Sequence, residues 1–349
     1  MRALTIDEHG FLDRVTFRDD VPEPALTHAG DVRVRVRAAS LNHLDLFVVA
    51  GLPGLAITPP WVLGSDAVGI VDAVGSAAGG VAIGARVVIN PGIGCGACEY
   101  CREGEHPLCV RFAVLGEHRP GTFADYVVVP ATHVREIPAT IPDELAAAFP
   151  LAGLTAWRMM VSRAKVRAGE LVLIQGIGSP VGIAALQVAK ARGATVWVTS
   201  SSDEKLARAR ALGADDCLNY RTQDVAQEVR VRTRKRGVDV VVDNSGKESW
   251  ASSLGALGRR GRLVTCGATT GPVVETDVRR LFWNQWTLMG TTMSNESEFH
   301  AVMDEFVAGR LTMPVDSVIP IERGREAFER VAGGKQFGKV VIRVSEEGG

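Results

Sequence analysis

The pattern of hydrophobic and polar positions changes near Leu151. Before that point, apolar residues come in short runs that glycine and proline interrupt. Val32, Val34 and Val36 alternate with arginines, which is the period-two pattern of a strand with one face in water. Further strands are indicated by apolar runs at residues 67–74, 85–89 and 123–129. The pattern predicts an irregular, β-rich lobe of barrel type.

After Leu151, predicted strands alternate with helices. The first strand, at 170–175, leads to a glycine-containing turn and a helix from Pro180 to Arg192. Ser201, followed by Glu204, resembles a capping box and predicts a second helix that ends at residue 212. Further strands are predicted at 195–199, 217–220, 238–243, 262–266 and 287–290. Alternation of apolar strands with helices is typical of a parallel, doubly wound sheet.

The last part of the chain returns to a mixed pattern. It predicts a helix at 297–308, a strand at 317–320, a short helix at 325–331 and a strand at 338–344. These pieces most simply complete the first lobe. We therefore predict an α/β protein of two domains, with residues 1–152 and 293–349 in the first and residues 153–292 in the second.

Composition narrows the class of function. The chain has 349 residues, of which 46% are hydrophobic and 23% charged, as in an ordinary globular protein of two domains. Its net charge of -1 gives no reason to expect nucleic acid or an anionic membrane as a partner, and the basic run at 230–236 is interpreted as a solvated helix face. No leader and no apolar run of membrane-spanning length is visible. We expect a cytoplasmic protein with a small-molecule substrate.

Four of the six cysteines stand close together, within residues 90–110. Their spacing, in a loop rich in glycine, allows four thiolates to close tetrahedrally around one zinc ion. Such an ion has no open position for water or substrate, so it stabilises a loop and does no chemistry. Two disulfides or reactive thiols are the alternative interpretation. The predicted zinc ligands are Cys95, Cys98, Cys101 and Cys109.

A glycine-rich turn follows the first predicted parallel strand. Gly176, Gly178 and Gly182 allow a tight turn and the close approach of a pyrophosphate, which then faces the N–H groups at the start of the helix. The spacing is one residue longer than the usual fingerprint, so its position between strand and helix is what favours dinucleotide binding. An ordinary loop between strand and helix is the alternative.

The end of the second parallel strand indicates which dinucleotide binds. NAD-binding proteins usually carry an acid there, whereas this chain has Ser200 followed by Ser201. Lys205 and Tyr220 could pair and hydrogen-bond with a 2′-phosphate. We therefore predict NADPH as the cofactor, with NAD(H) as the less favoured alternative.

These features together resemble the medium-chain dehydrogenase/reductase superfamily over essentially the whole chain. The resemblance implies a GroES-like catalytic lobe, a Rossmann NADP-binding lobe, hydride transfer with a nicotinamide and a homo-oligomer, either a dimer or a tetramer. We add Thr155 and Asn244 to the cofactor-binding candidates. The segments that carry the resemblance are AASLNHLDLF, VLGSDAVGIVDAVG, GTFADYVVVP, PLAGLTAW and FGKVVIRV, besides the cysteine loop and the glycine turn.

The alcohol dehydrogenases of that superfamily hold a second, catalytic zinc with Cys, His and Cys. By motif alignment, those places fall on Asn42, Ser65 and Ala152 in this chain. Alanine cannot coordinate, and amide or hydroxyl oxygens are poor zinc ligands beside thiolate and imidazole. We therefore expect one structural zinc per chain and no catalytic zinc.

The chain is thus more similar to the quinone oxidoreductase-like branch, whose members reduce quinones, enones or related carbonyls with NADPH. The resemblance makes Asn42 the first candidate for contact with the substrate oxygen or the nicotinamide ribose. Asp45 is expected to order that loop or the cofactor. Phe47 stands where the branch often has tyrosine, so the proton comes from His43 or from water.

Two other functions stay open from the sequence. One is a zinc-dependent alcohol dehydrogenase with atypical ligands. The other is a non-catalytic NADPH-binding protein, because an intact glycine turn fits that class equally well. An atypical second metal site could be built from His43, Asp45, Asp66, Glu117 and His118.

Overall fold

The computed structural model describes residues 1–345 and divides the chain into two compact units. Of the described residues, unit 1 contains 1–151 and 295–345, and unit 2 contains 152–294. The chain passes from unit 1 to unit 2 inside helix α4 (Pro150–Trp157). Residues 346–349, which end the first predicted domain, lie outside the described part.

Unit 1 is built on a seven-stranded sheet with the strand order β10-β6-β5-β3-β18-β17, in which β9 also pairs with β3. The sheet forms because β3 (Asp31–Ser40) buries Val32, Val34 and Val36 on one face and leaves the intervening arginines half-buried. Its other strands are β5 (Asp66–Val74), β6 (Arg86–Ile89), β9 (Tyr126–Pro130), β10 (Val134–Glu136), β17 (Val315–Pro320) and β18 (Lys339–Arg343).

Smaller sheets and helices complete unit 1. A three-stranded sheet has the order β2-β1-β4, and β7 pairs with β8. These strands are β1 (Ala3–Ile6), β2 (Thr16–Arg18), β4 (Trp61–Val62), β7 (Gly92–Ile93) and β8 (Ala113–Val114). The helices are η1 (Leu12–Arg14), α1 (His43–Ala50), α2 (Glu99–Arg102), η2 (His106–Leu108), η3 (Ala131–His133), α3 (Asp143–Ala148), α10 (Glu296–Val307), η5 (Ile321–Arg323) and α11 (Gly324–Ala332).

Strand register brings three distant segments of unit 1 together. Ser40, at the end of β3, pairs with Asp66 at the start of β5 and with Val341 in β18, both antiparallel. The N–H of Leu41 then donates to the carbonyl of Val340 over 3.0 Å. The first turn of α1 and the beginning of β18 therefore lie side by side, although some 300 positions separate them in the chain.

Unit 2 contains a six-stranded sheet whose strands are all parallel, in the order β13-β12-β11-β14-β15-β16. Counted along the chain this is the 3-2-1-4-5-6 order of the Rossmann fold. The strands are β11 (Leu171–Ile174), β12 (Thr195–Ser200), β13 (Asp216–Asn219), β14 (Val238–Val242), β15 (Leu257–Thr265) and β16 (Thr287–Gly290). The predicted parallel, doubly wound sheet is confirmed, and unit 1 is rich in strands, as predicted.

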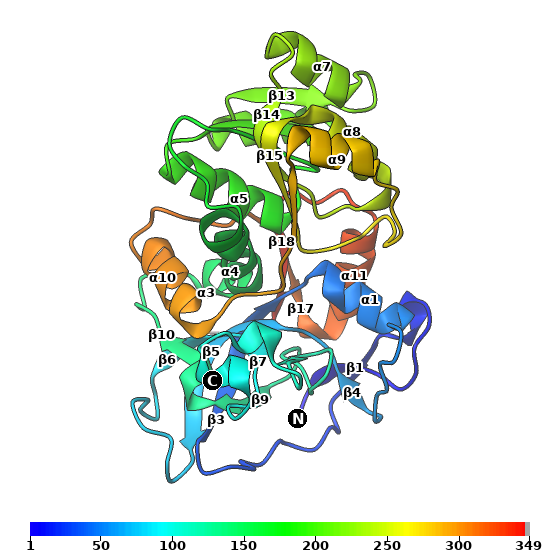
Figure 1. The fold of residues 1–349 in the computed structure, drawn as a ribbon. Helices are drawn as coiled ribbons and strands as arrows, with labels where there is room; N and C mark the ends of the chain where they lie inside the picture. Colours follow the sequence, from blue (N-terminus) through cyan, green and yellow to red (C-terminus); the bar gives the residue numbers. More distant parts are fainter. Residues whose placement is uncertain (346–349) are drawn as a thin grey trace. The chain divides into compact units, whose positions relative to one another are not determined.

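Helices cover both faces of this parallel sheet, with α5 on one side of the strands and α8 on the other (Figure 1). After the π-helical segment η4 (Arg158–Arg163), the helices are α5 (Pro180–Ala191), α6 (Asp203–Ala211), α7 (Val225–Arg232), α8 (Lys247–Ala256) and α9 (Val278–Asn284). Because all six strands are parallel, the turns that follow β11, β12 and β14 meet at one edge of the sheet. This is the edge where a ligand is expected in such folds.

Within residues 1–345, no helix has both the length and the apolar character that crossing a bilayer requires.

Candidate functional site

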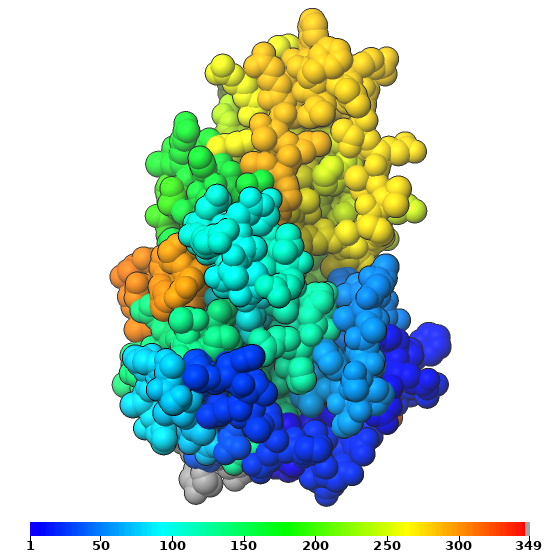
Figure 2. Space-filling model, turned by 60° about the horizontal axis from the view of Figure 1, so that its bottom comes forward, coloured from blue at the N-terminus to red at the C-terminus, as the bar shows by residue number. Residues whose placement is uncertain are grey.

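The four clustered cysteines lie in a surface loop of unit 1, drawn in cyan in Figure 2. Cys98 precedes helix α2, Cys101 lies within it, and Cys109 follows η2. Each cysteine offers one sulfur, and the four sulfurs lie within 4.8 Å of one another. In the described part of the chain, no other group of three or more His, Cys, Asp or Glu residues is placed to hold a metal ion.

The arrangement of the four sulfurs fits one tetrahedral zinc ion. Zinc–sulfur bonds of about 2.3 Å require sulfur atoms roughly 3.8 Å apart, which lies inside the observed spread. Backbone N–H groups of Ala97 and Cys98 donate to the sulfur of Cys95 and lower its pKa to about 5, which favours the thiolate. A Cβ atom at Gly94 would lie 2.9 Å from the sulfur of Cys101, so only glycine fits there.

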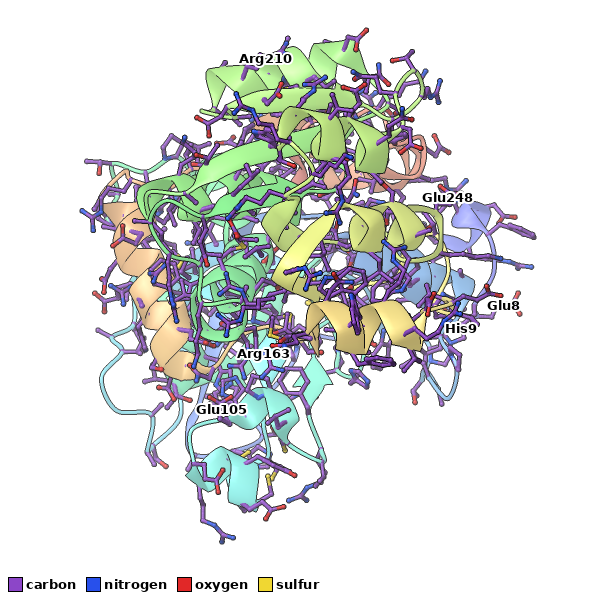
Figure 3. The ribbon with its side chains drawn as sticks, turned by 45° about the horizontal axis from the view of Figure 1, so that its top comes forward. Glu8, His9, Glu105, Arg163, Arg210 and Glu248 are labelled. Atoms are coloured by element: carbon purple, nitrogen blue, oxygen red, sulfur yellow. The ribbon has the colours of Figure 1, made fainter. Side chains whose placement is uncertain are left out.

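The base of this loop is tied to helix α10 of the same unit. Glu105, labelled in Figure 3, follows α2, and its Oε1 accepts a hydrogen bond of 3.0 Å from Nδ2 of Asn295. Asn295 is the N-cap of α10, so the cysteine loop and that helix support each other.

A buried polar network stands where β3, β5 and β18 meet. Lys339 is 0 % exposed, and its Nζ donates to Asn42 Oδ1 (2.7 Å), Asp66 Oδ2 (2.7 Å) and the carbonyl of Leu41 (3.1 Å). Asn42 Nδ2 donates to the same Asp66 oxygen over 2.9 Å. The other oxygen of Asp66 accepts from the N–H of Leu151 (2.7 Å). The network thus pairs one buried cation with one buried carboxylate and fixes the amide of Asn42 between them.

Asp45 is a second buried carboxylate beside this network. Its Oδ2 accepts from the backbone N–H of Asn42 over 2.7 Å, at the N-terminal end of α1. Burial raises the pKa of Asp45 to about 7, although the N–H groups of Asn42 and Gly64 and the charge of Lys339 oppose the shift. Asp45 therefore orders the loop that carries Asn42.

The structure does not gather the atypical second metal site considered from the sequence. Both oxygens of Asp66 are engaged in the lysine network. Among the described residues, the carboxylate of Glu117 pairs only with His118, at 3.6 Å between Oε2 and Nδ1. The same Nδ1 accepts from the N–H of Val114. Burial and the charge of Lys339 lower the pKa of His43, so this imidazole is neutral at pH 7.

Two of the three residues at the aligned zinc-ligand places are engaged in other hydrogen bonds. The hydroxyl of Ser65 donates to the carbonyl of Leu115 over 2.8 Å, and Asn42 belongs to the lysine network. Ala152, at the third place, is buried and carries no ligand atom. These three places therefore offer a metal ion one hydroxyl oxygen, one amide oxygen and, at the third place, no ligand atom.

The glycine turn of unit 2 has the backbone shape that the sequence predicts for it. Gly176 and Gly178 have φ values of 67° and 112°, which side chains other than glycine rarely adopt. Ser179 caps α5, and its Oγ accepts from the N–H of Gly182 over 3.2 Å. A Cβ atom at Gly182 would lie 2.9 Å from that oxygen. Asn244 follows β14, and its Nδ2 donates to Ser179 Oγ over 3.4 Å.

The end of β12 carries hydroxyl groups and no carboxylate. Ser200 is its last residue, and the N–H of Tyr220 donates to the Ser200 carbonyl over 3.1 Å. The side chain of Lys205 extends over the glycine turn, because a Cβ atom at Gly178 would lie 3.6 Å from its Nζ. These groups and the turn therefore share one edge of the sheet.

The predicted cap of helix α6 was placed one residue too early. The N-cap is Ser202, whose Oγ accepts from the N–H of Lys205 over 3.3 Å, and Ser201 has no such role. Three consecutive serines offer the same capping group, so the sequence pattern could not distinguish them. Ser201 lies half-buried between the strand and the helix.

Thr155 provides a test of whether unit 2 is shaped for a ligand. It lies in α4, and its hydroxyl oxygen is buried without a hydrogen-bond partner in the part of the chain that the structure describes. Buried hydroxyls are normally satisfied, so this one is available to a bound polar group. Together with the glycine turn, it fits a nicotinamide dinucleotide.

Sequence reasoning missed Lys339, a charged residue of unit 1 that is 0 % exposed. Lys339 belongs to the segment FGKVVIRV, which served only to carry a resemblance. The sequence did contain a signal for this site. A lysine followed directly by apolar strand residues is buried with them and needs a buried partner of opposite charge. The partner Asp66 was considered only as a possible metal ligand.

Comparisons with known proteins agree with this architecture. A family model described as the alcohol dehydrogenase GroES-like domain matches residues 28–139, and one described as zinc-binding dehydrogenase matches residues 180–308. A zinc-type alcohol dehydrogenase-like protein of Schizosaccharomyces pombe is 30% identical and aligns over 99% of both chains. An L-threonine 3-dehydrogenase of Anaeromyxobacter sp. is 32% identical over 93% of this chain and 94% of its own.

Solved structures show the same likeness. The crystal structure of an NAD-dependent alcohol dehydrogenase is 41% identical, with a TM-score of 0.93 over 99% of this chain and 100% of that one. A cobalt- and zinc-bound thermostable alcohol dehydrogenase from Pyrobaculum aerophilum is 34% identical, with a TM-score of 0.88 over 99% of each chain. The chain therefore belongs to the medium-chain dehydrogenase/reductase superfamily of NAD(P)-dependent oxidoreductases, among its zinc-binding, alcohol dehydrogenase-like members.

Proposed function

We propose that this protein is an NADPH-dependent reductase of quinones, enones or other activated carbonyls that works without a catalytic zinc. The observation that carries the proposal is the contact between Lys339 Nζ and Asn42 Oδ1 at 2.7 Å. A zinc ion bound to that oxygen would stand close to a buried ammonium group, where the low dielectric makes repulsion strong. The hydroxyl and methyl groups at Ser65 and Ala152 offer no thiolate or imidazole in compensation.

The proposed chemistry relies on hydrogen bonding and on positioning. When bound, the reduced nicotinamide supplies a hydride for the electrophilic carbon of the acceptor. Asn42 donates a hydrogen bond from Nδ2 to the acceptor oxygen, which stabilises the negative charge that develops there. Phe47 has no proton to give and His43 is neutral at pH 7, so the oxygen takes its proton from water. Conjugated acceptors fit best, because they spread that charge themselves.

The preference for NADPH rests on the end of β12. No carboxylate ends this strand, and the nearby cation Lys205 reaches the glycine turn. Ser200, Ser201 and the half-exposed Tyr220 add hydroxyl groups that can hydrogen-bond to a 2′-phosphate. Several relatives are named NAD-dependent alcohol dehydrogenases, so the preference needs a direct measurement.

The proposed cofactor contacts of unit 2 are Thr155, Gly176, Gly178, Gly182, Ser200, Ser201, Lys205, Tyr220 and Asn244. In unit 1 the proposed catalytic contact is Asn42, with Asp45 ordering its loop, and the structural zinc is held by Cys95, Cys98, Cys101 and Cys109. The cytoplasmic location stays a prediction.

The decisive experiment measures turnover and metal content in the same preparation. We expect one zinc per chain and oxidation of NADPH, in preference to NADH, with quinones and enones. Two zinc ions per chain with oxidation of simple alcohols would contradict the proposal in favour of a zinc-dependent alcohol dehydrogenase with atypical ligands. Tight NADPH binding without turnover of any quinone, enone or aldehyde would favour the non-catalytic binding protein.

The cofactor preference has its own test in the substitution Ser200→Asp. A carboxylate at this strand end repels a 2′-phosphate and accepts from ribose hydroxyls, so we expect the KM for NADPH to rise at least tenfold while that for NADH falls. Ala251→Asp, at an exposed position of helix α8, serves as a control that adds the same charge elsewhere in unit 2. An unchanged ratio of the two KM values in Ser200→Asp would contradict the assignment.

A further inference from the structure

We propose that Lys339 is a positioning residue whose buried ammonium group orients and polarises the amide of Asn42 for contact with the acceptor oxygen. The inference rests on the proposed function and adds the source of positive charge that a reductase without a catalytic metal needs. This lysine is 0 % exposed, and its ammonium group makes three hydrogen bonds inside the protein.

The hydrogen bonds of Lys339 account for all its donors. An ammonium group has three N–H bonds, and the carbonyl of Leu41, Asn42 Oδ1 and Asp66 Oδ2 accept one each. With no donor left over and no exposed surface, Lys339 cannot reach a substrate or deliver a proton to one. Its influence on the reaction must pass through a neighbour, and Asn42 is the neighbour that has a free donor.

The same contacts fix which way the amide of Asn42 points. Ammonium only donates and ionised carboxylate only accepts, so Oδ1 must face Lys339 and Nδ2 must face Asp66. The second N–H of Nδ2 has no acceptor within residues 1–345. Asn42 is 8 % exposed, so it reaches the surface of the unit while its amide is held from inside.

The cation also changes the strength of that free donor. A positive charge at the amide oxygen draws electron density from the nitrogen, so the remaining N–H becomes more positive and binds an oxyanion more strongly. Asp66 holds the ammonium in place and is itself fixed by the N–H of Leu151. The donor is therefore preorganised before any acceptor binds, which is what stabilisation of developing charge requires.

The experiment must distinguish a role of Lys339 in catalysis from a role in stability alone, because removing one partner of a buried ion pair destabilises a protein. Lys339→Met should lower Tm by about 10 °C, since it leaves Asp66 buried without its cation. Lys339→Met combined with Asp66→Asn removes both charges at nearly constant volume and should restore most of Tm. Lys335→Met, at an exposed position of the same segment, is the matched control and should change neither Tm nor kcat.

Steady-state kinetics with NADPH and an enone then test the assignment. In the charge-neutral double variant we expect Tm near that of the wild type, an unchanged KM for NADPH and a kcat about ten- to a hundredfold lower. We expect Asn42→Ala to lose as much or more, and Lys339→Met to cause little further loss of kcat when Asn42 is already alanine, because the lysine acts through that amide.

Three results would overturn the assignment. The first is a charge-neutral variant that is stable and retains the wild-type kcat. The second is a full additional loss from Lys339→Met in the Asn42→Ala background, which would show that the lysine acts by another route. The third is a wild-type protein that turns over no acceptor, which removes the proposed function itself and is recognised before any variant is made.

Discussion

At the scale of single residues, burial gives two neighbouring carboxylates of unit 1 different properties. Asp66 faces the ammonium group of Lys339 at 2.7 Å. Asp45, in the first turn of helix α1, accepts hydrogen bonds from backbone N–H groups, and burial raises its pKa to about 7. One carboxylate thus serves as a fixed counter-ion, and the other changes its protonation near neutral pH.

The raised pKa of Asp45 predicts a pH dependence of stability. Between about pH 4 and pH 7 the folded state holds a proton on Asp45 that the unfolded state has released, so stability falls as pH rises through this window. Asp45→Asn removes the effect. The free energy of unfolding of the variant minus that of the wild type should therefore increase with pH, by at most about 1.4 kcal/mol per pH unit, and level off above pH 8.

Urea denaturation of both proteins at several pH values measures this difference. A difference that stays constant from pH 4 to pH 8 would contradict the assignment, because it would mean that Asp45 titrates alike in the folded and unfolded chain.

Thr155 supports a second prediction at this scale. Its buried hydroxyl has no partner in the described residues, so Thr155→Val removes an unsatisfied group and should leave Tm unchanged or slightly higher. If the hydroxyl bonds to the cofactor, the same variant should bind NADPH about tenfold more weakly. Isothermal titration and thermal unfolding measure the two effects. A lower Tm with normal NADPH affinity would show that the hydroxyl has a structural role.

At the scale of elements, a few neighbouring residues determine the conformation of two loops. The cysteine loop combines close cysteine spacing with Gly94, where any Cβ atom would meet Cys101 and His106 at less than 3 Å. The turn after β11 combines Gly176 and Gly178, both at positive φ, with the Ser179 cap. Both loops are therefore fixed by a few residues of special geometry more than by packing.

Removal of one cysteine tests the metal site. Cys98→Ser replaces a thiolate by a poor zinc ligand, so we expect the zinc content to fall from one per chain to well below one, with a lower Tm. Cys217→Ser, in strand β13 outside the cluster, is the matched control and should keep one zinc per chain. Retention of a full zinc in Cys98→Ser, measured by elemental analysis, would rule out the four-cysteine site.

At the scale of the whole molecule, one face of unit 2 indicates self-association. Strand β16 ends the parallel sheet and, within residues 1–345, pairs only with β15, which leaves an open edge. Exposed apolar side chains stand just before it, in and beside helix α9. They are Val273, Val278, Phe282 and Trp283, and Trp283 is 69 % exposed. An open sheet edge and exposed apolar side chains are both features that a second copy can cover.

We therefore expect a homo-oligomer that depends on this face. Trp283→Glu should shift the protein to monomers in light scattering coupled to size exclusion, because a charge then replaces a large apolar contact. Phe11→Glu is the control, since Phe11 is 85 % exposed and belongs to unit 1. A wild-type monomer, or a Trp283→Glu variant with unchanged mass, would contradict the prediction.

The sequence by itself determined the periodic and locally coded features. The alternation at 32–37 predicted β3, and the alternation of apolar strands with helices predicted the parallel sheet. The glycine turn was readable for the same reason, because each of these signals lies within a few neighbouring residues. Element boundaries were predicted less accurately. Strand β15 begins at Leu257, where the sequence predicted residue 262, and the cap of α6 is Ser202, where the sequence predicted Ser201.

Only the tertiary structure decided which distant polar residues meet. Antiparallel pairing of β3 with β18 brings Lys339 to Asn42 and Asp66, and no local pattern encodes a contact across some 300 positions. Burial, which sets the pKa of Asp45, likewise depends on what all the other strands cover. Short-range geometry is written in adjacent residues, whereas long-range contacts and burial follow from how the whole sheet assembles.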